Sequence, residues 1–115
     1  MTVKRHQPSK ILSSCTEGGG MVFTAGVVAE DTSKDIKGQT QDILGQIDKL
    51  LAAAGTNKSK VLYTQIWITD IRLRDAMNEV WLKWVDAKNL PARACVEARL
   101  ADPKMLIEIQ MTAVK

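Results

Sequence analysis

An arginine, a cysteine and a glutamate near the C-terminus carry the chemistry that the sequence suggests first. Arg93 and Cys95 lie two positions apart in the segment 91–100, and Glu108 lies in a second segment, 106–113. A planar guanidinium binds a carboxylate through two parallel hydrogen bonds, and a partly buried carboxylate activates water or supplies a proton. Arg93 is therefore a candidate for binding a small carboxylate, and Glu108 is a candidate acid or base. From the pattern alone, ion pairing of either residue within the protein is an equal alternative.

Both segments alternate between polar and apolar residues. Such a period of two predicts strands with one face on a core, and the interruption at Ala101–Lys104, which contains Pro103, suits a turn. We therefore predict a hairpin of 91–100 with 106–113. Its buried face carries the alanine, valine, leucine, isoleucine and methionine side chains, and its other face carries the polar residues named above.

The rest of the chain predicts one α+β domain spanning residues 1–115. Apolar residues recur at three- and four-residue steps from Ile36 to Ala54, before a glycine stop, and again from Leu73 to Val85, which predicts two helices. Residues 1–8 form an arm or a short edge strand. The expected order is β-β-α-β-α-β-β, with strands at 11–16, 21–25 and 61–69 and then the hairpin, in a mixed sheet with both helices on one face.

The strand 61–69 is predicted to be central, because both of its faces are fairly apolar. If both helices cover the face that carries Leu62, Thr64, Ile66 and Ile68, the opposite face stays open in a single chain. We expect that face to carry Val61, Tyr63 and Trp67 beside Arg93, Cys95 and Glu108. An open apolar face usually marks an interface, so the sequence predicts a closed homo-oligomer.

Composition excludes several classes of function. The net charge of +3 is scattered along the chain, which argues against a nucleic-acid partner. No stretch has the roughly 18 to 20 apolar residues of a membrane span, and the N-terminus lacks the apolar run of a secretory signal. Cys15 and Cys95 match no metal spacing, and a single histidine, His6, argues against a histidine-based triad. We expect a cytoplasmic protein with reduced thiols.

The run Pro91-Ala92-Arg93-Ala94-Cys95-Val96, followed by Ile107-Glu108-Ile109, resembles the signature of the RidA (YjgF-like) family of reactive-intermediate deaminases, also known as L-PSP endoribonucleases. Supporting likenesses lie in Gly19–Gly26, in Ile43–Gly55 and in Met77-Asn78 with the tryptophans that follow. The resemblance implies a chorismate-mutase-like fold and a homotrimer with three clefts between subunits. It also implies hydrolysis of 2-imino or 2-enamino acids to 2-keto acids and ammonia, without cofactor or metal.

The resemblance also assigns roles to individual residues. It implies that Arg93 holds the substrate carboxylate, that Glu108 places or activates water, and that the backbone around Cys95 lines the cleft with Asn78. For Asn78, capping of a neighbouring backbone group is an equal alternative. Tyr63 and Trp67 are further candidates for the cleft, whereas Trp81 and Trp84 are assigned to the core or an interface.

The chain departs from the family at Leu12, which stands where a tyrosine is usual, and in a short loop at 86–90. These departures concern the identity of the substrate more than the type of reaction. Three functions follow in decreasing order of support: an imine deaminase, a non-catalytic trimeric module that binds a carboxylate metabolite, and an endoribonuclease.

Overall fold

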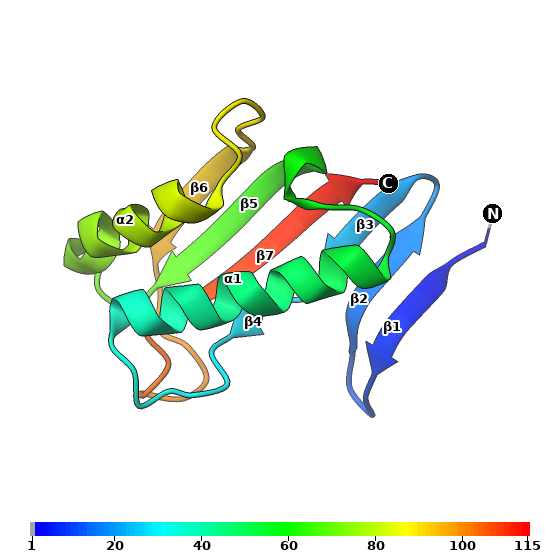
Figure 1. The fold of residues 1–115 in the computed structure, drawn as a ribbon. Coiled ribbons are helices and arrows are strands. Elements are labelled where there is room, and N and C mark those ends of the chain that lie inside the picture. The colour runs from blue at the N-terminus through cyan, green and yellow to red at the C-terminus, as the bar shows by residue number, and fades with distance from the viewer. Residues whose placement is uncertain (1) are drawn as a thin grey trace.

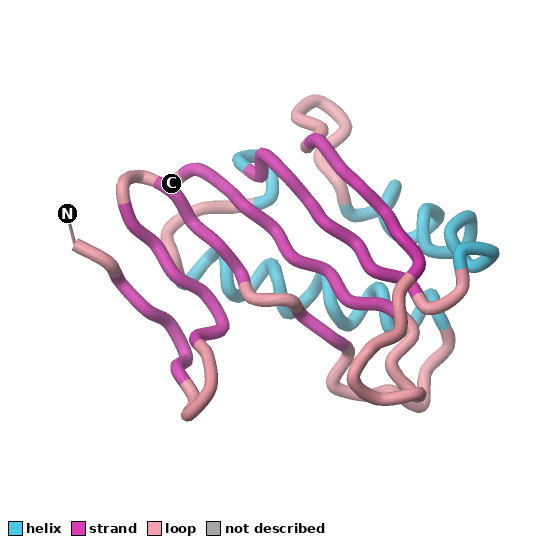
Figure 2. Tube along the Cα trace, turned by 180° about the vertical axis from the view of Figure 1, so that it is seen from behind, coloured by secondary structure: helices cyan, strands magenta, loops and turns pink. Residues whose placement is uncertain are grey.

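The computed structural model describes residues 2–115 as a seven-stranded mixed sheet with two helices, α1 and α2, packed on one face (Figure 1). The predicted α+β class is confirmed. The elements are β1 (Lys4–Pro8), β2 (Ser13–Gly18), β3 (Met21–Thr24), β4 (Val27–Val28), α1 (Ile36–Ala53), β5 (Val61–Ile68), α2 (Arg74–Trp84), β6 (Ala92–Glu97) and β7 (Ile107–Val114), with short 3-10 turns at Lys58–Lys60 and Ile71–Leu73. The helices lie behind the strands in Figure 2, so the opposite face of the sheet is open in one chain.

The strand order is β1-β2-β3-β7-β5-β6, with β4 pairing beside β7. Strand β5 lies inside the sheet, but it is second from the β6 edge and not at the centre as predicted. It separates β6 from β7, so the predicted hairpin is wrong. β6 runs parallel to β5, and β7 runs antiparallel to it. The link between them passes the end of β5, where Ala98 N donates to Ile68 O (2.9 Å) and Thr69 N donates to Leu106 O (3.0 Å). Alternation in a sequence fixes the faces of a strand and not its neighbours.

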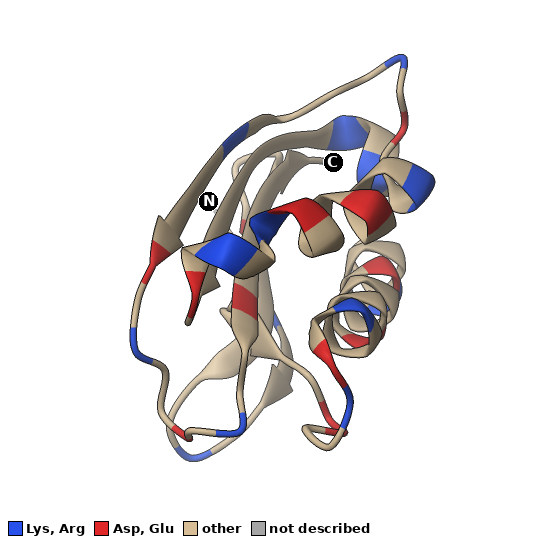
Figure 3. Cartoon of the chain, turned by 90° about the vertical axis from the view of Figure 1, so that its left-hand side faces the viewer, with Lys and Arg blue, Asp and Glu red and all other residues tan. Residues whose placement is uncertain are grey.

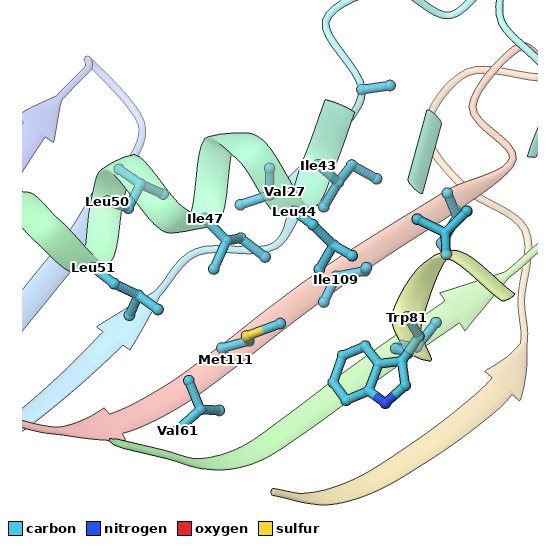
Figure 4. Close-up of a cluster of buried hydrophobic side chains, with 14 of the residues drawn as sticks. Val27, Ile43, Leu44, Ile47, Leu50, Leu51, Val61, Trp81, Ile109 and Met111 are labelled. Atoms are coloured by element: carbon cyan, nitrogen blue, oxygen red, sulfur yellow. The ribbon is translucent and has the colours of Figure 1, made fainter. Parts of the chain in front are cut away.

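Helix α1 forms where the sequence predicts it, from Ile36 to Ala53. The Asp35 carboxylate caps its N-terminus by accepting from Gly38 N (2.9 Å), and Gly55, with φ of +78°, ends it in a conformation that glycine adopts without strain. Its apolar stripe packs on β7, as Figure 4 shows for Ile43 and Ile47 near Ile109. These side chains are fully buried, and the stripe fixes which face of the sheet is covered.

Helix α2 begins after the turn at Ile71–Leu73, where the Asp70 carboxylate accepts from Arg72 N (3.0 Å). It is tied to α1 by an ion pair between Lys37 and Glu79 and by the Trp84 Nε1 donor, which lies 3.0 Å from Asp48 Oδ2. These contacts hold α2 above β5 and β6, the edge of the sheet that carries Arg93 (Figure 1).

The faces of β6 are the reverse of the prediction. Arg93 pairs in register with Thr64 and Cys95 with Ile66, and both of these β5 residues are fully buried under the helices. Arg93 and Cys95 therefore lie on the helix-covered face, while Val96, which was expected in the core, is 44% exposed on the open face. Burial of small alanine and valine side chains contributes little free energy. The alternation in β6 therefore does not decide whether the alanine and valine side chains or the Arg93 and Cys95 side chains face the core.

A β-bulge reverses one end of β5 as well. The register of β5 with β7 shifts between Val61 and Tyr63. Val61 is buried, whereas Leu62 is 50% exposed, which is the opposite of the predicted faces. A bulge adds one residue to a strand and turns the following side chains to the other face, and a sequence pattern does not reveal it.

The N-terminal segment forms the short edge strand β1. His6 Nε2 lies 2.7 Å from Glu17 Oε2, and Lys115 Nζ donates to Glu17 Oε1 at 2.6 Å. These contacts, Lys115 first, lower the pKa of Glu17 to about 2. The contacts tie β1 and the C-terminus to β2.

Neither α1 nor α2 is long and apolar enough to cross a bilayer, and the structure describes no other α-helix in residues 2–115.

Candidate functional site

The guanidinium of Arg93 is the centre of the candidate site. It projects from β6 under α2, and its Cζ lies 5.0 Å from the centre of the Trp81 ring, within the range of a cation–π contact. The side chain is half-buried, and this burial lowers the pKa of Arg93. The tryptophan supports one side of the guanidinium without neutralising its charge.

Three buried side-chain atoms have no hydrogen-bond partner within residues 2–115: Thr64 Oγ1, Asn78 Oδ1 and Arg93 Nη1. Thr64 is the neighbour of Arg93 in register on β5, and Asn78 lies one helical turn before Trp81, the residue that supports the guanidinium. Nearly all buried polar atoms in proteins are paired, since an unpaired one costs about 1–3 kcal/mol. Their gathering around one cation offers a carboxylate a charged donor and offers an N–H group two acceptors.

Cys95 follows Arg93 on the same face of β6 and is half-buried. Burial raises the pKa of its thiol, and the charges of Arg93 and Arg74 offset this only in part. The chain's single histidine, His6, lies on β1 at the opposite edge of the sheet. Cys95 therefore remains a thiol with no base beside it, which argues against a nucleophilic role.

Glu108 lies on the other face of the sheet. It pairs in register with Trp67 of β5 and with Val28 of β4, and its side chain is half-buried. Gly26 packs directly against its carboxylate, because a Cβ atom at that position would lie 2.9 Å from Glu108 Cδ. Only glycine leaves room for the glutamate in this conformation.

The predicted site residues thus form two groups. Arg93, Cys95 and Asn78 lie on the helix-covered side, while Glu108, Tyr63 and Trp67 lie on the open side. Tyr63 is 37% exposed there. The sheet separates the two groups, so the expectation that Arg93 and Glu108 approach each other within one chain is wrong. The error follows from the predicted hairpin, in which both would have shared a face.

Sequence reasoning missed three residues of this arrangement. Thr64 is correctly predicted to be buried in β5. A hydroxyl among apolar side chains was the one sign that this position has a role beyond packing. Trp81 was assigned to the core, where it is buried, but it also lies against Arg93. Gly26 was noted only as part of the family likeness, and nothing in the pattern linked it to Glu108.

Other hollows of the single chain lie away from Arg93. One, of about 290 Å³, lies between α1 and α2 and is lined by Leu44, Val80 and Trp84 among others. Another, of about 360 Å³, is bordered by both Leu12 and Gly26. Leu12, the departure from the family pattern, therefore lies beside β4 and α1, and Arg93 is not among the residues that line the same hollow.

Replacing Thr64 with valine tests whether this hydroxyl serves a ligand. Because the hydroxyl has no partner within residues 2–115 and can also donate to a carboxylate oxygen, we expect an unchanged or higher free energy of unfolding and weaker binding of carboxylates. Thr40→Val is the matched control: Thr40 Oγ1 donates to Ile36 O at 2.7 Å, so its loss should cost about 1 kcal/mol without affecting binding. Chemical denaturation and calorimetry measure both effects. Equal destabilisation by the two variants would contradict a ligand role for Thr64.

Comparisons with known proteins agree over the whole described chain. The family model described as Endoribonuclease L-PSP matches residues 2–115. A RutC family protein of Haemophilus influenzae is 42% identical over 114 residues, covering 98% of each chain. The RutC family protein YoaB of Escherichia coli is 40% identical over 86 residues, or 75% of each chain.

Solved structures show the same fold. A YjgF protein family member from Neisseria meningitidis superposes with a TM-score of 0.97 at 41% identity, covering 100% of this chain and 96% of that one. A member of the YjgF/YER057c/UK114 family from Mycobacterium tuberculosis gives a TM-score of 0.89 at 28% identity, covering 99% and 100%.

Proposed function

The chain belongs to the Endoribonuclease L-PSP family, which includes the YjgF and RutC proteins, and from this membership and the site around Arg93 we propose that it hydrolyses 2-imino and 2-enamino acids to 2-keto acids and ammonia. The observation that carries the proposal is the half-buried, unpaired guanidinium of Arg93 beside two unpaired polar atoms. A carboxylate bound there places the adjacent C=N carbon among groups able to bind its nitrogen.

The reaction needs water, one base and one acid. Arg93 binds the substrate carboxylate through two charge-assisted hydrogen bonds. Glu108 takes a proton from water as the oxygen attacks the imine carbon, and it gives that proton to the nitrogen as the C=N bond becomes single. Glu108 then takes the hydroxyl proton of the tetrahedral intermediate and gives it to the nitrogen, so that ammonia leaves as the C–N bond breaks and the C=O bond of the keto acid forms.

This chemistry requires residues from two chains. Since the sheet separates Arg93 from Glu108 within one chain, we propose that each cleft combines Arg93 of one subunit with Glu108 of a neighbour. The open face also exposes Phe23, Tyr63 and Val96 by 44%, 37% and 44%. Burial of these apolar side chains against neighbouring copies supports a homotrimer.

Light scattering or sedimentation tests this assembly. At micromolar concentration we expect a mass of three times the 12.7 kDa of one chain. A monomer mass would contradict both the trimer and the shared cleft. We further propose that the protein acts in the cytoplasm, where the free Cys15 and Cys95 stay reduced.

The activity is tested with an imino acid generated in situ by an amino-acid oxidase. We expect the protein to accelerate loss of the imine and release of the keto acid, with the oxidase rate unchanged. Because Leu12 stands where a tyrosine is usual in the family, the substrates tested are imino acids with apolar, polar and acidic side chains. No acceleration on any member would contradict the deaminase proposal.

A non-catalytic module that binds a carboxylate metabolite is the second candidate. One observation favours it. The cation and its polar neighbours come from β5, α2 and β6 and lie on one face of the sheet in a single chain, whereas Glu108 lies on the other face. Carboxylate binding without acceleration of imine hydrolysis would support this candidate. RNA cleavage has less support, because basic and acidic residues are interspersed on the side shown in Figure 3 and no histidine lies near Arg93.

Replacing Cys95 with serine should leave most of the activity. Its thiol has no base beside it and lies half-buried on the face that carries Arg93, so serine conserves the size of the side chain and the backbone geometry. We expect kcat/KM to fall by less than about tenfold, far less than the loss for a residue that binds the substrate. Near-complete loss with the oligomer intact would instead assign chemistry to the sulfur.

A further inference from the structure

Helix α2 brings a second arginine toward the site. Arg74, Asn78 and Trp81 are spaced four and three residues apart, so they share one side of the helix. Trp81 lies against the Arg93 guanidinium, and Asn78 supplies one of the unpaired buried atoms. Arg74 continues this row by one turn, at the first residue of α2, and its side chain is exposed.

The charge of Arg74 reaches both groups on β6. Burial is the main reason that the pKa of Arg93 is lowered, and Arg74 lowers it further. Arg74 also lowers the pKa of Cys95, against the larger opposite effect of burial. The two guanidinium groups are thus close enough for their charges to repel each other, and the Arg93 guanidinium is partly shielded from water.

No carboxylate of the described chain offsets these two charges. The ion pairs within residues 2–115 are Lys37–Glu79, Arg72–Asp70, Lys115–Glu17 and His6–Glu17, and none involves either arginine. Two neighbouring cations without a counter-charge disfavour each other, and an anion that contacts both relieves the cost. One carboxylate neutralises Arg93 and leaves the charge of Arg74.

We propose that Arg74 is a second anion-binding residue of this site and selects substrates with an acidic group on the side chain, that is, imino and keto dicarboxylates. The inference rests on the proposed function for the identity of the imino acid. In this arrangement Arg93 binds the carboxylate next to the reacting carbon. Arg74 binds the distal carboxylate across the row formed by Asn78.

Calorimetry with two keto acids of equal chain length tests the proposal. 2-Oxoglutarate carries the distal carboxylate, and 2-oxopentanoate lacks it. We expect the wild-type protein to bind 2-oxoglutarate about fivefold more tightly, in line with an exposed ion pair at low ionic strength. Arg74→Met should abolish that preference and leave the affinity for 2-oxopentanoate within about twofold. Arg72→Met is the matched control, since Arg72 is an exposed arginine paired with Asp70 (2.7 Å).

Three results would overturn the proposal: no preference in the wild-type protein, no binding of either keto acid, or equal weakening of both ligands by Arg74→Met. The last result would mean that Arg74 pairs with a carboxylate of the protein, such as Glu108 of a neighbouring copy. The measurement is one of binding, so a failed imine assay contradicts the deaminase alone. Absence of the preference in the wild-type protein, with both keto acids still bound, contradicts the role of Arg74 alone.

Discussion

Replacing Arg93 with alanine should lower kcat/KM for imino-acid hydrolysis by about 10²- to 10⁴-fold, because two charge-assisted hydrogen bonds of about 1.5–3 kcal/mol each are lost. The guanidinium is half-buried, has an unpaired Nη1 and forms no ion pair with a carboxylate of residues 2–115. Its removal therefore breaks no ion pair that stabilises the fold. We expect the free energy of unfolding of the ligand-free protein to fall little.

Two further variants sharpen this result. Arg93→Lys keeps the charge but lacks the planar pair of donors, so its activity should stay well below that of the wild-type protein. Arg99→Ala removes an exposed arginine beyond the end of β6 and should change nothing. If Arg93→Ala retained more than about half of the activity, a site centred on this guanidinium would be wrong.

Replacing Glu108 with glutamine should lower kcat by about 10²- to 10⁴-fold, the usual contribution of a general acid–base group. Keto-acid affinity should change little, since the carboxylate of the ligand is bound by Arg93. Glutamine has the same shape, so it fits the space above Gly26 that a Cβ would close. The comparison therefore isolates the loss of the proton-transfer group from any change of packing.

Glu97→Gln is the control for Glu108→Gln. Glu97 is exposed at the end of β6, where Oε1 accepts from Ile71 N at 3.0 Å, and the amide oxygen of glutamine preserves that bond. We expect its kinetics to match the wild-type protein. An equal loss of keto-acid affinity and kcat in Glu108→Gln would assign Glu108 to ligand binding, and unchanged kcat would remove it from the mechanism.

The sequence predicted secondary structure and burial correctly where large apolar side chains recur at regular spacing. The stripe of α1 and its glycine stop, the interior position of β5 and the class of the fold follow from burial of isoleucine and leucine. It misled where small residues left the choice open. In β6 the alternation is carried by alanine and valine on one row and by Arg93 and Cys95 on the other, and the structure covers the second row.

The site was predictable only in part, for the same reason. Arg93 and Glu108 came from a local motif, which records residue types and spacing. Their separation by the sheet depends on β5 lying between β6 and β7, a long-range pairing that the motif does not contain. Thr64 and Gly26 matter through contacts with residues distant in the sequence, and their own positions show no unusual pattern.

Co-assembly of the two inactive variants tests most directly whether each site is shared between chains. Arg93→Ala and Glu108→Gln chains, carrying different affinity tags, would be expressed together and mixed oligomers purified through both tags. In a mixed trimer of either composition, about one of the three sites pairs an intact Arg93 with an intact Glu108 from the neighbouring chain.

We therefore predict that co-assembly restores about a third of the wild-type kcat per site, far above either parent. Mixing the two purified parents without exchange of subunits should restore nothing. Mixed oligomers no more active than the sum of the two parents would contradict a site built from Arg93 of one chain and Glu108 of the next.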